Sequence, residues 1–115
     1  GPYLLYTYAR AKSILRKSST NKNKFKISEV SDLEKSLILQ LSNFPEIVKR
    51  AYLNLASNLI ANYAYNLAQT FNNFYNSSQV IGSKQEDFRL SLVNAFSIIL
   101  KKSLNLLAID TLEEM

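Results

Sequence analysis

Cysteine and histidine are both absent from this chain of 115 residues. Their absence excludes disulfides, the usual structural zinc ligands, cysteine or Ser/His nucleophiles, and the commonest general base. A chain without cysteine also fits a reducing compartment. The sequence has no glycine-rich phosphate loop and no spaced carboxylate cluster on one helix face. It therefore offers no catalytic constellation and no metal site.

Glycine and proline are scarce, with two of each, and one of each stands at the very start. An all-β domain needs many turns and usually contains more of both. The hydrophobic fraction is 47%, which is enough for a packed core. The length suits a single domain. The composition therefore predicts one all-α domain over 1–115, an antiparallel bundle of four to five helices.

Acidic residues are missing from the first 28 positions, although half of the 14 basic residues lie there. Those basic residues are Arg10, Lys12, Arg16, Lys17, Lys22, Lys24 and Lys26. Positions 51–83 carry no charge at all and are rich in Asn, Gln, Tyr and Phe. A basic segment joined to amides and aromatics suits a partner that has both phosphates and flat hydrogen-bonding rings. Single-stranded or looped nucleic acid is such a partner.

The uncharged stretch is long enough to span a bilayer, but its many asparagines and glutamines argue against a membrane helix. No secretory signal pattern opens the chain. We therefore expect no membrane partner and interpret the chain as an excised domain.

Helical periodicity divides the domain into three parts. A basic helical segment covers 1–17, a polar basic linker covers 18–28, and the bundle body with its C-terminal tail covers 29–115. In the body, Ser31 and Glu34 have the spacing of a capping box at the start of a helix. Pro45 interrupts that helix and suits the first position of the next one.

A broad apolar stripe predicts a long helix over 59–75, with Ser57 as its break or cap. Asparagines recur every four residues before and within this helix and predict a row along it, formed by Asn54, Asn58, Asn62 and Asn66. Coding bias toward asparagine would produce the same row. Ser83 and Glu86 have the spacing of a second capping box, which predicts the start of the last long helix there.

Three sequence blocks, in a fixed order, resemble a known family. The first is Gly-Pro-Tyr-Leu-Leu-Tyr-Thr-Tyr-Ala-Arg at 1–10, followed by 13–17. The second comprises 44–46 and 61–75, and the third runs from 89 to 109 and closes at the terminal Met. Over nearly its whole length the chain resembles the C-terminal anticodon-binding domain of class I arginyl-tRNA synthetases, the all-α DALR-type domain. The likeness favours Gly1-Pro2 as native sequence over a tag scar.

The chain departs from the family's pattern at a few positions. Tyr8 stands where a histidine is frequent, and Ser78 stands where a cysteine is common. Ser103 and Ala108 replace usual glycines, and Leu112 replaces a usual proline. The replaced glycines change the geometry of helix ends and hardly affect recognition.

The resemblance implies a role in tRNA binding. The domain would dock the anticodon stem-loop of tRNA-Arg so that the parent enzyme can attach arginine in an ATP-dependent reaction. This fragment would not be an enzyme on its own and would need no cofactor, whereas the parent would use ATP with Mg. Its partners would be tRNA-Arg and the catalytic core of the same chain, in a monomeric, cytoplasmic protein.

The resemblance also suggests which residues meet the anticodon loop. These are Tyr3, Tyr6, Phe74, Tyr75 and Met115. Tyr3 would stack on a splayed base, or would instead pack against the catalytic core. An aromatic stripe at helical spacing is more often core, as expected for Phe71, but Phe74 and Tyr75 point in different directions, so at least one should face solvent. Met115 would offer its carboxylate to a base, or would be a frayed end.

Basic residues near the start would bind phosphates. They are Arg10, Arg16, Lys17, Lys22 and Lys24. The alternatives are an ordinary solvated face and, for Arg10, a buried structural partner. A different class of function also stays open, namely a helical protein–protein interaction module that uses the uncharged 51–83 surface.

Overall fold

The structure, a computed structural model, describes residues 2–18 and 29–113. Its helices are α1 (Pro2–Lys17), α2 (Asp32–Ser42), α3 (Phe44–Asn54), α4 (Asn58–Ser77) and α5 (Glu86–Glu113). The described residues contain no strand. The predicted all-α bundle is confirmed, with five helices in the described part of the chain.

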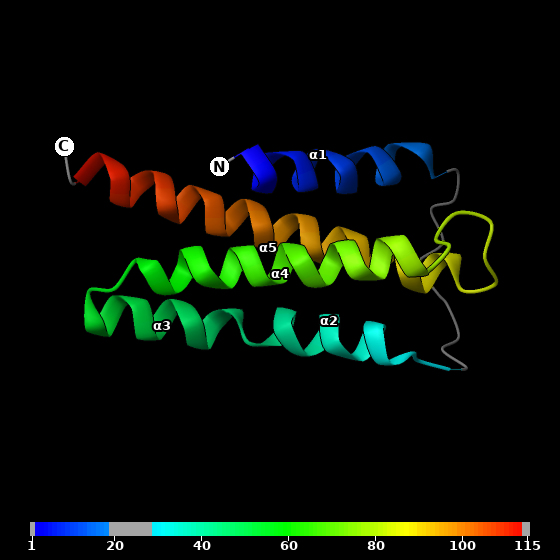
Figure 1. Ribbon diagram of the computed structural model, residues 1–115, viewed down its shortest axis with the longest axis horizontal. Coiled ribbons are helices and arrows are strands. Elements are labelled where there is room, and N and C mark those ends of the chain that lie inside the picture. Colours follow the sequence, from blue (N-terminus) through cyan, green and yellow to red (C-terminus); the bar gives the residue numbers. More distant parts are fainter. Residues whose placement is uncertain (1, 19–28, 114–115) are drawn as a thin grey trace.

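The helices line up along one axis of an elongated bundle that measures 47 × 24 × 23 Å. Figure 1 shows α2 and α3 end to end along one side of α4, with α5 antiparallel to α4 and α1 on the far side of α5. The short links between α3 and α4 and between α4 and α5 explain why these neighbours are antiparallel. α1 runs antiparallel to α2 and therefore parallel to α4 (Figure 1). It contacts both α4 and α5.

The core lies between α4 and α5 and is closed by α1 on one side and by α2 on the other. Phe71 and Phe96 stack at its centre, with ring centroids 4.1 Å apart and planes only 4° from parallel. Leu4, Ala11 and Ile14 seal it from α1, and Leu37 seals it from α2. The expectation that Phe71 belongs to the core is confirmed.

The first predicted capping box is present with both of its hydrogen bonds. The Glu34 amide donates to the Ser31 hydroxyl at 3.1 Å, and the Ser31 amide donates to the Glu34 carboxylate at 2.8 Å. Pro45 lies in the first turn of α3, as predicted, since a missing N–H costs nothing at a helix start. Asn43 is both the C-cap of α2 and the N-cap of α3, so this one residue separates the two helices.

The asparagine row does not run along one helix. Leu55 adopts a left-handed conformation, with φ of 50°, and ends α3 before α4 begins at Asn58. Asn54 therefore belongs to α3, and only Asn58, Asn62 and Asn66 follow one another on α4. Ser57 is the N-cap of α4, as predicted, but its side chain makes no capping hydrogen bond.

The predicted second capping box is wrong, because α5 begins at Glu86 itself. The Ser83 hydroxyl donates to the Val80 carbonyl at 2.9 Å, and the Glu86 carboxylate accepts from the Gly82 amide at 2.6 Å. These bonds build the turn that precedes the helix. Gly82 has φ of +87° there, a conformation that favours glycine.

Residues Glu86–Ile109 of α5 are long and apolar enough to cross a membrane, judged by length and composition alone. One such helix is weak evidence, since the central helix of a bundle passes the same test. In this bundle α5 contacts α1, α2 and α4. We therefore interpret its apolar character as that of a core helix.

Candidate nucleic-acid interface

Aromatic and polar side chains from α1 and α4 meet on one face of the bundle. We call this group the tyrosine–arginine cluster; it comprises Tyr3, Tyr6, Arg10, Tyr65, Asn72 and Tyr75. Residues three, four and seven apart lie on the same side of a helix, so each helix presents its members as one stripe. The parallel packing of α1 on α4 brings the two stripes together.

Asn72 joins the two helices. Its Nδ2 donates to the Tyr3 hydroxyl at 2.9 Å and to the hydroxyl of the buried Thr7 at 3.2 Å. Its Oδ1 accepts a hydrogen bond from Nη1 of Arg10 at 2.8 Å. One amide thus holds three side chains of successive α1 turns in fixed positions.

The Arg10 guanidinium lies against two tyrosine rings. Its central carbon is 4.5 Å from the ring centroid of Tyr75 and 5.1 Å from that of Tyr6, distances typical of cation–π contacts. Its Nη2 also donates to the Tyr6 hydroxyl at 3.3 Å. Because a guanidinium on an aromatic face is planar and weakly hydrated, this arrangement makes a flat platform with one positive charge.

The rings of the cluster are partly open to solvent. Tyr6 is 63% exposed, Tyr65 is 55% exposed and Tyr75 is 37% exposed. Tyr3 is half-buried, and its ring lies 4.9 Å from that of Tyr65. Partly exposed aromatic side chains beside a fixed cation are what unstacked bases bind in single-stranded regions.

Four of the residues singled out from the sequence come together here, namely Tyr3, Tyr6, Arg10 and Tyr75. Arg10 is half-buried with protein partners, which agrees with the alternative of a structural role. Arg16 and Lys17 lie in the last turn of α1 and are exposed. Lys22, Lys24 and Met115 lie outside the described residues.

The expectation that Phe74 offers its ring to a base needs correction. Phe74 is 0% exposed and packs 6.2 Å from Phe71, ring centroid to ring centroid. One residue along a helix rotates the side chain by about 100°, so Tyr75 faces out where Phe74 faces in. Tyr75 is therefore the solvent-facing member of the pair.

Asn72, Tyr65 and Thr7 were missed in the sequence. Tyr65 and Asn72 both lie in the block 61–75 that carries the resemblance, and their spacing of seven places them on one helix face. Thr7 is a polar residue at a buried position of α1, between Leu4 and Ala11. A hydroxyl on an apolar stripe signals a hydrogen-bond partner on the neighbouring helix.

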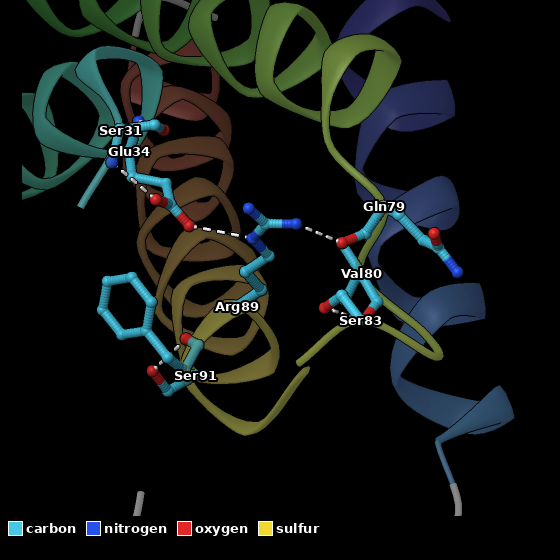
Figure 2. Close-up of polar contacts among 8 residues, drawn as sticks. Ser31, Glu34, Gln79, Val80, Ser83, Arg89 and Ser91 are labelled. Atoms are coloured by element: carbon cyan, nitrogen blue, oxygen red, sulfur yellow. Dashed lines mark hydrogen bonds and ion pairs between the residues drawn. The ribbon is translucent and has the colours of Figure 1, made fainter. Parts of the chain in front are cut away.

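A second polar cluster lies just beyond the C-terminal end of α4, where α2, α5 and the turn between α4 and α5 meet (Figure 2). Arg89 donates from Nε to Oε2 of Glu34 at 3.0 Å and from Nη1 to the Gln79 carbonyl. Glu34 is only 1% exposed, and its other oxygen belongs to the capping box. These bonds satisfy the buried carboxylate, so the cluster ties elements together and leaves no open site.

Burial by itself would raise the pKa of the Glu34 carboxyl. The amide and hydroxyl of Ser31 and the Arg89 guanidinium donate hydrogen bonds to it, and the charge of Arg89 adds attraction. Together these interactions outweigh burial and hold the pKa of Glu34 below its ordinary value. At Tyr63 burial is the cause that decides, and it raises the pKa to about 12. The Tyr63 hydroxyl donates a hydrogen bond to the Gln40 carbonyl.

An apolar groove lies where the turn between α3 and α4 meets the end of α5. It is lined by Val48, Ala51, Tyr52, Leu55, Ala56, Ser57, Ile60, Leu106 and Ile109. Leu55 and Tyr52 are almost fully exposed beside it. Among the described residues no three acidic, cysteine or histidine side chains gather where they could hold a metal ion.

Comparison with known proteins agrees with the resemblance. The family described as the DALR anticodon binding domain matches residues 4–115. Arginine–tRNA ligases of Methanopyrus kandleri and Lactococcus lactis are 41% and 44% identical to the chain over its full length, which corresponds to 20% and 21% of theirs. The structure of Thermus thermophilus arginyl-tRNA synthetase superposes with a TM-score of 0.85 and 33% identity, over 93% of this chain and 20% of that one. The chain thus spans about a fifth of the length of these relatives.

Proposed function

The chain belongs to the DALR anticodon-binding domain family, and from that premise we propose that it binds the anticodon stem-loop of tRNA-Arg through the tyrosine–arginine cluster. The observation that carries the proposal is the partly exposed set of rings around the Arg10 guanidinium. A nucleotide loop offers unstacked bases, and each base has a flat face that can stack on such rings.

In this proposal the tyrosines bind bases by stacking, and the basic residues bind phosphates by charge. Tyr3, Tyr6 and Tyr75 receive loop bases, and each stack contributes roughly 1–3 kcal/mol. The exposed Arg16 and Lys17 at the end of α1 contact backbone phosphates. Lys22, Lys24 and Met115 keep the roles expected from the sequence, phosphate contact for the lysines and base contact for the terminal residue.

The intact protein is an arginine–tRNA ligase in this proposal, a cytoplasmic monomer that attaches arginine to tRNA-Arg with ATP and Mg. The described residues do not fit ATP with Mg, because they contain neither a glycine-rich phosphate loop nor a cluster of acidic side chains. The ATP chemistry belongs to the part of the parent outside this chain. The contribution of this domain is orientation, since a docked anticodon arm fixes where the acceptor end lies.

Titration with two RNAs at two salt concentrations tests the proposal. The intact protein and the 115-residue chain are each titrated with tRNA-Arg and with the same tRNA altered only in its anticodon loop. We expect affinity to fall by orders of magnitude between about 50 and 200 mM salt and to fall again on the loop change. If the intact protein binds both RNAs with equal affinity, only binding to phosphates remains and anticodon readout is refuted.

A second candidate function is protein binding through the uncharged 51–83 surface. The exposed Tyr52, Leu53 and Leu55 beside the apolar groove favour it. Salt separates the two candidates, because an apolar protein interface responds little to ionic strength. Leu55→Ser would weaken binding of a protein partner while leaving tRNA affinity unchanged.

A further inference from the structure

We infer that Asn72 is a positioning residue for RNA recognition, an inference that rests on the proposed function. Its amide fixes the orientation of the Tyr3 ring and of the Arg10 guanidinium without itself contacting RNA. Asn72 is half-buried between α1 and α4, and the three α1 side chains it bonds to, Tyr3, Thr7 and Arg10, lie around it.

The bonds of Asn72 account for the positions of the Tyr3 ring and the Arg10 guanidinium. A lone arginine side chain samples many rotamers, and ordering it costs conformational entropy. The 2.8 Å bond from Nη1 to the Asn72 carbonyl oxygen orders Arg10 before any ligand arrives, between the rings of Tyr6 and Tyr75. The 2.9 Å bond to the Tyr3 hydroxyl does the same for the ring that lies beside Tyr65.

A pre-ordered platform binds more tightly because fewer side chains lose freedom on binding. Since Asn72 carries no charge, its effect should appear in recognition of the loop and not in salt dependence. If Asn72 only held α1 on α4, its substitution would instead lower the thermal stability and weaken the binding of both RNAs equally. These two behaviours distinguish positioning from packing.

Substitutions at position 72 test the inference in the intact protein. Asn72→Ala removes every bond. Asn72→Asp keeps an acceptor for Arg10 and can accept from the Tyr3 and Thr7 hydroxyls, because hydroxyl groups rotate to donate. Asn73→Ala is the matched control, an exposed asparagine one position along the same helix. For each variant we measure the ratio of affinities for tRNA-Arg and its loop-altered form, the salt dependence and the melting temperature.

We expect Asn72→Ala to reduce the affinity ratio by about tenfold, the order of one lost base stack, with the salt dependence unchanged. Asn72→Asp should keep most of the affinity ratio, although its negative charge lowers the affinity for both RNAs equally. Asn73→Ala should match the unmodified protein. If Asn72→Ala keeps the ratio, or if Asn72→Asp loses as much as Asn72→Ala, the positioning role is overturned. If the unmodified protein itself has a ratio near one, the proposed function and this inference both fail.

Discussion

At the scale of single residues, the neighbours Phe74 and Tyr75 show how a helix sorts side chains. Phe74 is buried in the core, while Tyr75 stacks under Arg10 with more than a third of its surface open. The sequence indicates that the two point apart, but it does not indicate which one faces out. That depends on where α1 and α5 pack against α4, which no local pattern specifies.

Truncation of Tyr75 should weaken tRNA binding. Tyr75→Ala removes a ring that can stack on a base and also one of the two rings against which Arg10 lies, so we expect a loss of roughly 1–3 kcal/mol in binding free energy, read from the tRNA-Arg titration. Tyr52→Ala is the control, since Tyr52 is 79% exposed near the other end of the molecule and should bind normally. If Tyr3→Ala, Tyr75→Ala and deletion of Met115 all leave the affinity unchanged, the site assignment is refuted.

At the scale of elements, the Glu34–Arg89 pair joins the start of α2 to α5 and to the turn before it. Arg89→Met leaves the Glu34 carboxylate buried without its cation, which should cost about 3 kcal/mol of unfolding free energy, measured by urea denaturation. The matched control is Arg50→Met, which breaks the exposed pair with Glu46. That pair lies in water on one helix, so the control should change stability by less than about 0.5 kcal/mol.

The same pair predicts a pH dependence of stability. The folded state lowers the pKa of Glu34 below the unfolded value of 4.5, so the stabilisation is fully present above that value and is lost as the pH falls through the folded pKa. The difference in unfolding free energy between the unmodified chain and Glu34→Gln should therefore shrink as the pH drops below 4.5. A difference that stays constant from neutral to acidic pH would contradict this.

The end of α3 is a site where substitution should stabilise the fold. Leu55 holds φ at 50° with 92% of its surface exposed, so it carries the steric cost of a left-handed residue and gains no burial. Leu55→Gly relieves that cost, partly offset by the greater freedom of glycine in the unfolded chain, and should raise stability by about 0.5 kcal/mol. Thermal melting measures it, and Leu55→Ala, which keeps the Cβ, should show no such gain.

Local signals predicted the elements well and their ends unevenly. Ser31 with Glu34 is a true capping box, and the buried Glu34 carboxylate is also held in place by Arg89. Ser83 with Glu86 has the same spacing, yet Gly82 takes up a positive φ and turns the chain so that α5 begins three residues later. The prediction of one continuous asparagine row was wrong for a similar reason, because no residue pattern indicated that Leu55 adopts a left-handed conformation.

At the scale of the whole molecule, the exposed charges of α1 are separated from the rings proposed to bind bases. Arg16 and Lys17 end the helix, one or two turns beyond the ring-bound Arg10. Arg16→Gln with Lys17→Gln should lower the slope of log affinity against log salt by about 2 if both contact phosphates. The loop discrimination should persist in this variant. An unchanged slope would assign both residues to an ordinary solvated face.

The site could be predicted from the sequence only in part, and the reason is its construction across the bundle. The resemblance and the aromatic content pointed to Tyr3, Tyr6 and Tyr75, but nothing local connects them to Asn72. Their meeting depends on the parallel packing of α1 on α4, which follows from the arrangement of all the helices.

The bonds between Arg10 and Asn72 and between Tyr3 and Asn72 span 62 and 69 residues of sequence. During synthesis α1 is made before α4, so its tyrosines and arginine lack their α4 partners until most of the domain has been made. Contacts of such separation form late in folding, after the local helices. The proposed RNA-binding cluster therefore exists only once α1 has packed on α4, and a chain truncated before α4 would present the same α1 residues without it.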